Sequence, residues 1–266
     1  MFQKQPSIEL HNGIEIPLYG LDTIALNASE AYTFVRQAID NGIRHIETAA
    51  EYGIEAEIGK AIADSGIGRS ELFLTDEISG IRNTGATRRS AEAALRRLST
   101  DYVDLLLMGW NGGQSEEDPA NSGVYLAWKG LESLYKSGKA HAIGIVDFAP
   151  WQIEYLLQDV EIAPMVSHVG LYPGHPDIAK LNSNEEHAIL TMAYLPKCIE
   201  AVISSRELGI LAKKHECQPY DIILQYLRCK QCAITLRQTN ISHHEVPLDE
   251  EEIHFLDSMK DYGEAL

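Results

Sequence analysis

The sequence predicts a (β/α)₈ barrel, a closed ring of eight parallel strands that alternate with helices. Strand-like runs recur eight times along the 266 residues, and stretches with helical periodicity separate them. A doubly wound open sheet shares this alternation, but it usually has about five to seven strands, and no G-x-G-x-x-G motif follows the first strand here. The chain shows no linker, repeat or low-complexity segment, so we expect residues 1–266 to form a single barrel domain.

The elements follow in a regular order. A hairpin comes first, because two apolar runs within 7–18 flank the turn-forming pair Asn12-Gly13, and we expect it to close the amino-terminal end of the barrel. Ser29 is expected to cap the first helix, which ends at Gly42. The eight strands are predicted at Leu18–Leu21, Arg44–Glu47, Leu72–Thr75, Val103–Met108, Ala142–Ile145, Met165–Val169, Ile189–Ala193 and Ala233–Leu236. Further helices are predicted over 55–63, 87–98, 124–135, 151–157 and 208–215, with a short or irregular one within 175–187.

Composition narrows the class of protein. With 22 Lys and Arg against 39 Asp and Glu, the formal charge is −17, which opposes binding to nucleic acid or to anionic lipid. No apolar run approaches the roughly 20 residues that span a bilayer, and we expect a cytoplasmic protein that acts on a small molecule.

Of the four cysteines, Cys229 and Cys232 have redox spacing but follow a helical run, so we interpret them as partly buried thiols. The oligomeric state is not encoded in any pattern we recognise.

Six groups of residues carry a family resemblance. They are His11–Pro17, Gly42–Gly53, Arg69–Thr75, Leu95–Leu98 with Asp101–Leu105, Gly138-Lys139 with Ile143–Ile145, and Ala193-Tyr194-x-Pro196. Together and in this order, from residue 8 to about residue 240, the chain resembles the aldo-keto reductase superfamily. The resemblance implies a TIM barrel opened by an N-terminal hairpin, and the reduction of carbonyl groups with NAD(P)H.

The catalytic positions that the resemblance implies are altered. Members of the family use an Asp, a Tyr, a Lys and a His at the carboxyl-terminal mouth of the barrel. The corresponding residues here are Glu47, Tyr52, Glu77 and Gly109, so only the tyrosine is unchanged. The change from Lys to Glu reverses the charge where the family's reaction needs a cation. We therefore expect a degenerate tetrad in which the usual mechanism does not operate.

The cofactor positions that the resemblance implies are altered as well. The family holds the nicotinamide carboxamide with Ser-Asn after the fifth strand and a Gln on the sixth, where this chain has Val146-Asp147 and Ser167-His168. A Lys-Ser pair with a downstream Arg grips the 2′-phosphate, where this chain has Arg237-Gln238 and His243. Arg237 remains as a residual cofactor-binding residue. We therefore expect weak NADP(H) binding or none.

The residues at the mouth suggest proton transfer. The resemblance implies that Glu47 and Glu77 end neighbouring strands, and two carboxylates in one partly dry cleft separate into an acid and a base. Tyr52 is a third proton-transfer candidate. The remaining candidates at the mouth are expected to bind substrate: Asp147, His168, Trp110 and Tyr194. Carboxylates with one imidazole also suit Mg²⁺, Mn²⁺ or Zn²⁺, so a divalent metal is possible at Glu47, Glu77, Asp147 and His168.

Three functions follow from these residues. The leading hypothesis is a non-redox acid–base enzyme, such as a lyase, isomerase, dehydratase or cyclase acting on a small metabolite. The second is an NAD(P)H-dependent oxidoreductase with an altered proton relay. The third is a non-catalytic binding or regulatory subunit. Each site residue also has a purely structural interpretation: Asp147 could cap the helix near Pro150, and His168 could bond to a backbone carbonyl within the barrel.

Overall fold

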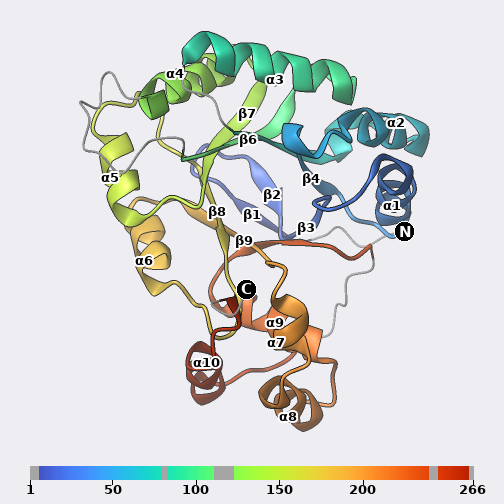
Figure 1. Ribbon diagram of the computed structural model, residues 1–266, viewed down its shortest axis with the longest axis vertical. Coiled ribbons are helices and arrows are strands. Elements are labelled where there is room, and N and C mark those ends of the chain that lie inside the picture. The colour runs from blue at the N-terminus through green and yellow to red at the C-terminus, as the bar shows by residue number, and fades with distance from the viewer. Residues whose placement is uncertain (1–5, 80–82, 111–122, 240–244, 264–266) are drawn as a thin grey trace.

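Eight parallel strands close into a barrel in the computed structural model, which describes residues 6–79, 83–110, 123–239 and 245–263 (Figure 1). The strands are hydrogen-bonded in the order β10-β3-β4-β5-β6-β7-β8-β9. Their bounds are β3 Tyr19–Asp22, β4 His45–Ala49, β5 Phe73–Ile78, β6 Val103–Gly109, β7 Ala140–Val146, β8 Val166–Gly170, β9 Leu190–Tyr194 and β10 Ala233–Leu236. The predicted (β/α)₈ barrel and each of its eight predicted strands are confirmed.

The amino-terminal hairpin is also confirmed. Strands β1 (Ser7–Glu9) and β2 (Glu15–Pro17) pair antiparallel, and Gly13 in the turn has the positive φ of +84° that glycine adopts readily. The buried side chains of Leu10 and Ile16 belong to the same apolar cluster as the barrel residues Leu105 and Leu107. The hairpin therefore closes the end of the barrel opposite to the carboxyl ends of its strands.

Helices surround the strands, as Figure 1 shows. They are α1 Ala28–Asp40, α2 Glu55–Ser65, α3 Thr84–Leu98, α4 Gly123–Lys136, α5 Pro150–Leu157, α6 Ile178–Glu186, α7 Ile199–Ile203, α8 Arg206–Lys214, α9 Pro219–Cys229 and α10 Glu250–Asp257. Short 3₁₀ turns lie at Ala50–Tyr52 and Arg69–Glu71. Among the described residues, no helix is both long and apolar enough to cross a membrane.

One local prediction about a helix end needs correction. Asn27, and not Ser29, caps α1: the Asn27 side chain accepts hydrogen bonds from the backbone N–H groups of Ser29 and Glu30, and Glu30 accepts from the Asn27 N–H. Asn27 has the extended backbone of an N-cap, whereas Ser29 is already within the helix. Helix α6 is short as expected but regular, because Asp177 caps it from a left-handed backbone conformation.

The core has an outer and an inner part. Outward-facing strand residues such as Ile46 and Leu106 pack beneath the helices, together with the fully buried Trp128 of α4. Inward-facing residues near the hairpin, Leu105 and Leu107 among them, are apolar. Toward the carboxyl ends the inward-facing positions become polar. The four cysteines are free; Cys232 is buried as expected, whereas Cys229 at the end of α9 is exposed.

Candidate active site

Polar side chains gather where the barrel strands end. Because successive residues of a strand point to opposite faces, alternate positions near the carboxyl ends face the barrel interior. The interior-facing positions that concern the site are Asp22 of β3, Glu47 of β4, Glu77 of β5, Gly109 of β6, His168 of β8, Tyr194 of β9 and, just after β10, Arg237. The carboxyl end is where barrels of this type hold their active sites.

Glu47 and His168 meet inside the barrel. Glu47 Oε1 lies 3.1 Å from His168 Nδ1, and both residues are buried. The other ring nitrogen, His168 Nε2, lies 3.2 Å from Thr235 Oγ1. Burial lowers the pKa of His168 to about 3, so its ring is neutral at neutral pH. Burial and the charges of Asp22 and Glu77 raise the pKa of Glu47 well above its usual range.

Two atoms of this pair lack a hydrogen bond. Glu47 Oε2 and His168 Nδ1 are both buried and have no hydrogen-bond partner among the described residues. The 3.1 Å separation of His168 Nδ1 from Glu47 Oε1 is therefore a close contact without hydrogen-bond alignment. Buried polar atoms without a partner are uncommon, because their desolvation is not offset.

Glu77 lies beside this pair at the rim. One ligand-type atom from each of Glu47, Glu77 and His168 lies within 4.8 Å of the others. Gly109 leaves the space next to Glu77 open, since a Cβ built there would come within 3.8 Å of Glu77 Oε1. Burial raises the pKa of Glu77 to about 7, and the charges of nearby carboxylates, Asp147 foremost, contribute.

Tyr52 ends the 3₁₀ turn that follows β4, and it is partly buried. Burial raises its pKa, and the negative charges of Asp22, Glu47 and Glu77 raise it further. The nearby guanidinium of Arg237 opposes this effect, but its Nε lies 3.4 Å from Asp22 Oδ2. Tyr52 is thus surrounded by more negative than positive charge.

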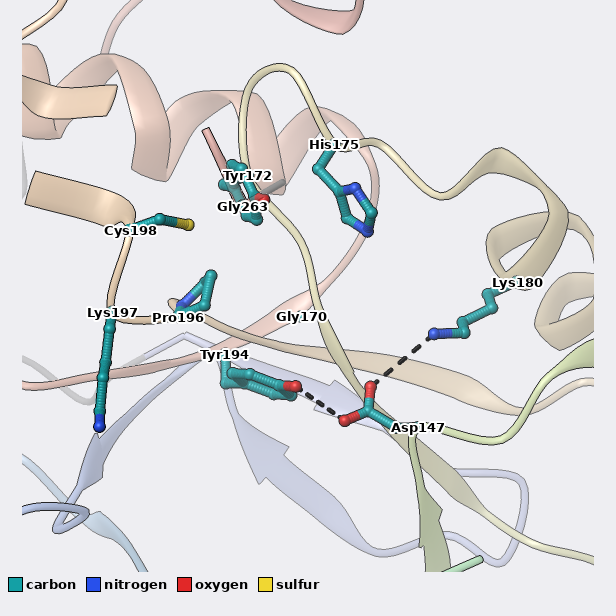
Figure 2. A pocket seen from close by; sticks show the side chains of 10 residues that line it. All are labelled: Asp147, Gly170, Tyr172, His175, Lys180, Tyr194, Pro196, Lys197, Cys198 and Gly263. Carbon is teal, nitrogen blue, oxygen red and sulfur yellow. Dashed lines mark hydrogen bonds and ion pairs between the residues drawn. The ribbon is translucent and has the colours of Figure 1, made fainter. Parts of the chain in front are cut away.

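A cavity of about 390 Å³ opens at the ends of β8 and β9, next to Asp147 (Figure 2). Tyr194 Oη donates a hydrogen bond of 2.7 Å to Asp147 Oδ2, and Lys180 Nζ lies 3.8 Å from Asp147 Oδ1. The ring of Tyr194 lies against Gly170, where a Cβ would come within 3.1 Å of Tyr194 Cζ. Lys197 also lines the cavity, and Lys180 Nζ lies closer to a second carboxylate, 3.0 Å from Asp177 Oδ2.

Trp110 directly follows β6 and belongs to an aromatic group. Its ring meets those of Phe148 and Trp151 edge to face, with centroids 5.2 Å and 5.4 Å apart. Trp151 is 48% exposed, so part of this aromatic surface is open to solvent. A substrate-binding role for Trp110 stays a prediction.

The sequence-derived candidates thus fall into two neighbouring groups. Glu47, Glu77 and His168 come together inside the barrel, whereas Asp147 and Tyr194 line the cavity beside them. Neither structural alternative describes these residues: the N-cap of α5 is Ala149 and not Asp147, and His168 contacts a hydroxyl and a carboxyl oxygen and not a backbone carbonyl. His243 lies outside the described residues.

Sequence reasoning missed four residues at this end of the barrel: Asp22, Thr235, Lys180 and Lys197. Asp22 had a usable signal, because it directly follows the predicted first strand at its carboxyl end. Thr235 was placed on a strand but was not assigned to the interior face. Lys180 lies in the first turn of α6, where the sequence predicts only a short or irregular helix, and Lys197 lies on the segment between β9 and α7, where no periodicity indicates direction.

Similarity to known proteins decides the family. The sequence model described as "Aldo/keto reductase family" matches residues 18–193. The chain belongs to the aldo/keto reductase family. It is 35% identical to a glyoxal reductase of Bacillus subtilis, over 83% of this chain and 78% of that protein. A solved aldo-keto reductase from a Medee basin deep-sea metagenome library has a TM-score of 0.87 at 28% identity, covering 96% of this chain and 95% of that one.

The comparisons correct the leading functional hypothesis. A family of reductases, with a glyoxal reductase among the similar proteins, supports an oxidoreductase and not a lyase, isomerase, dehydratase or cyclase. The same comparisons also support an enzyme and not a non-catalytic subunit. The substituted residues misled the sequence interpretation, because loss of one proton relay does not by itself exclude hydride transfer.

The comparisons also bear on the cofactor. A Bombyx mori aldo-keto reductase solved in complex with NADP has a TM-score of 0.84 at 24% identity and covers 96% of this chain and 93% of that one. We expected little or no NADP(H) binding by this chain, whereas this protein of the same fold was solved with NADP bound. At this identity the likeness shows the fold alone.

Proposed function

We propose that this aldo/keto reductase reduces the carbonyl group of a small molecule with NADPH or NADH. The observation that carries the proposal is its 35% identity over 222 residues to a glyoxal reductase. Small aldehydes and dicarbonyl compounds such as glyoxal are the substrate class that this likeness suggests. Tyr52, the one residue of the family's tetrad retained here, lies at the mouth of the barrel beside Asp22 and Glu47.

The side chains at this end of the barrel are better suited to bind the phosphates of a dinucleotide than its nicotinamide carboxamide. Lys180 and Lys197 line the cavity at the ends of β8 and β9, and Arg237 follows the adjacent strand β10, so cations are available for phosphates. The carboxamide positions fit less well: Asp147 already accepts a hydrogen bond from Tyr194, and the buried His168 contacts Glu47 and Thr235. We propose that the phosphates supply most of the affinity and that binding is weaker than in a member with the full carboxamide grip.

When bound, the dinucleotide supplies the hydride that reduces the carbonyl carbon. Tyr52 is the residue that we propose donates a proton from its Oη to the carbonyl oxygen. Because burial and three carboxylates raise its pKa, the hydroxyl is a weak acid in this setting. Trp110 and Trp151 provide an aromatic surface at the end of β6 that suits the apolar part of a substrate.

The direct test is the oxidation of NADPH and of NADH by the purified protein, with glyoxal as the carbonyl compound. We expect turnover that depends on both the protein and glyoxal, and formation of the corresponding hydroxy aldehyde. A panel of short aliphatic and aromatic aldehydes then defines the substrate class. The proposal fails if neither dinucleotide is oxidised with any member of the panel by protein that is shown to be folded by circular dichroism.

A further inference from the structure

We propose that Glu47, Glu77 and His168 bind one divalent transition-metal ion at the mouth of the barrel. The three side chains come from β4, β5 and β8, and one ligand atom from each lies within 4.8 Å of the others. Two carboxylates with one imidazole are ligands that Zn²⁺ and Mn²⁺ accept. The ion's binding does not depend on the proposed function, whereas the catalytic role given to it below does.

The orientation of His168 favours a cation. If Nε2–H donates to Thr235 Oγ1 at 3.2 Å, Nδ1 carries a lone pair and no proton, 3.1 Å from Glu47 Oε1. Two lone-pair atoms 3.1 Å apart repel each other unless a proton or a cation lies between them. A hydrogen bond from the second nitrogen is also the usual support of a metal-bound histidine.

The distances are compatible with one ion. Two adjacent ligands about 2.1 Å from an ion lie about 3.0–3.4 Å apart, which brackets the separation of Glu47 and His168. The Glu77 oxygen lies within 4.8 Å of the other two ligand atoms, so it must approach by at most about 1.4 Å to reach the separation of about 3.4 Å in a tetrahedral site. Glu77 is only half-buried at the rim, and Gly109 leaves space beside it, so a small rotation of its side chain is available.

Burial provides a second, independent observation. Glu47 is 2% exposed, and its Oε2 has no hydrogen-bond partner among the described residues. A proton shared between Glu47 and His168 would satisfy that pair alone and would leave the charge of Glu77 uncompensated. An ion satisfies all three groups and offsets the surplus of carboxylates, which includes Asp22 and Asp147.

The ion has a role in the proposed reaction. With three protein ligands, such an ion would keep one coordination position open, the arrangement typical of catalytic zinc. From there it would polarise the carbonyl oxygen and place positive charge near Tyr52. The family's reaction uses a lysine at the position of Glu77, so the ion would restore a cation where this chain has a carboxylate.

Calorimetry of metal binding tests the proposal without dinucleotide or substrate. The Cys229→Ser background removes the exposed thiol, a competing metal ligand. Protein stripped with a chelator is titrated with Zn²⁺ and with Mn²⁺ at neutral pH. We expect one ion per chain in the micromolar range or tighter, and at least tenfold weaker binding for Glu77→Gln and for His168→Gln. Exposed Glu51→Gln, next to the site but outside the ligand set, is the matched control and should bind like the background.

A second readout uses Co²⁺, whose visible absorption reports its ligands and should change in Glu77→Gln but not in Glu51→Gln. Melting curves show whether each variant is folded. If the buried variant His168→Gln does not fold, the test rests on Glu77→Gln, because Glu77 lies at the rim. The proposal is overturned if neither Zn²⁺ nor Mn²⁺ binds, or if Glu77→Gln and His168→Gln bind like the background. Metal binding without reduction of glyoxal or of any aldehyde on the panel would instead contradict the proposed function alone.

Discussion

Glu47 Oε1 and His168 Nδ1 lie 3.1 Å apart, although their strands are on opposite sides of the barrel. In the ring of eight strands, β4 and β8 are four positions apart, which is the largest separation that the ring allows. The contact therefore spans the interior of the barrel, where other barrels of this type pack apolar side chains. Because Glu47 and His168 lie at this depth, candidate reactive groups are found inside the barrel as well as on its loops.

Replacement of Tyr52 by Phe should abolish most of the carbonyl reduction. The change removes the hydroxyl that we propose donates the proton, and loss of a general acid typically costs about 10²–10⁴-fold in rate. NADPH affinity should remain within about twofold, because the aromatic ring stays in place. Steady-state kinetics with glyoxal, together with a fluorescence titration with NADPH, separate the two effects.

Tyr102→Phe is the matched control for that variant. Tyr102 stacks on His141 near the amino-terminal end of the barrel, far from the proposed chemistry. Its loss of a hydroxyl should leave kcat within about twofold of the wild type. Equal activity of Tyr52→Phe and wild type would remove Tyr52 from the reaction.

Asp147→Asn should strengthen NADPH binding. The carboxylate of Asp147 repels an anionic dinucleotide, and an amide at this position retains an acceptor for the Tyr194 hydroxyl. Asparagine also tolerates the left-handed backbone of residue 147, where φ is +54°. We expect roughly tenfold tighter binding, which corresponds to about 1.4 kcal/mol.

Fluorescence titration measures the affinity, with Asp101→Asn as a charge-matched control. Asp101 is exposed and precedes β6, at the end of the barrel away from the cavity. Both variants lose one negative charge, so a gain in Asp147→Asn alone identifies a local effect. A similar gain in both would indicate that only the net charge of the chain matters.

The sequence was sufficient to locate the eight strands, because strand-like runs alternate regularly with helical stretches along the chain. The resemblance to the aldo-keto reductases then placed Glu47, Glu77 and His168 at the carboxyl-terminal mouth, because Glu77 lies two residues beyond the strand predicted at Leu72–Thr75. Sequence could not show that Glu47 and His168 touch, because their separation depends on how the barrel closes between β3 and β10. It also missed Asp22, since the predicted first strand ended one residue earlier, and Lys197, since its direction depends on a loop.

Gly20→Ala should destabilise the fold. A Cβ at residue 20 would come within 2.5 Å of Nδ1 of the buried His45, whose Nε2 is held 2.9 Å from Thr75 Oγ1. Because the ring cannot move freely, we expect a loss of about 1–3 kcal/mol in the free energy of unfolding. Urea unfolding followed by circular dichroism measures it.

Gly209→Ala provides the opposite case. Gly209 is exposed within α8, and nothing lies within 4 Å of a Cβ built there. Alanine should therefore stabilise the chain by about 0.5–1 kcal/mol, because it restricts the unfolded backbone. If both glycine variants shift the urea midpoint in the same direction, close packing at Gly20 is not what determines its effect.

The charge of Glu252 should make stability depend on pH. Burial alone would raise the pKa of Glu252, but hydrogen bonds from Lys214, from the Asp249 backbone N–H and from His215 lower it to about 2. Lys214 Nζ and His215 Nε2 lie 2.8 Å and 2.7 Å from Glu252 Oε1. A lowered acid pKa means that the folded state favours the carboxylate. Its contribution is thus fully present above the ordinary pKa of 4.5 and is lost as the pH falls toward 2.

Glu252→Gln should therefore cost about 1–2 kcal/mol in the free energy of unfolding at pH 7, and progressively less as the pH falls below 4.5. Glu251→Gln, an exposed neighbour on α10, is the control and should cost less than about 0.5 kcal/mol at either pH. Urea unfolding at pH 7 and at pH 3 makes the comparison. A loss for Glu252→Gln that is equal at both values would mean that the side chain acts through packing, because a charge effect must fade as the unfolded-state carboxylate becomes protonated below pH 4.5.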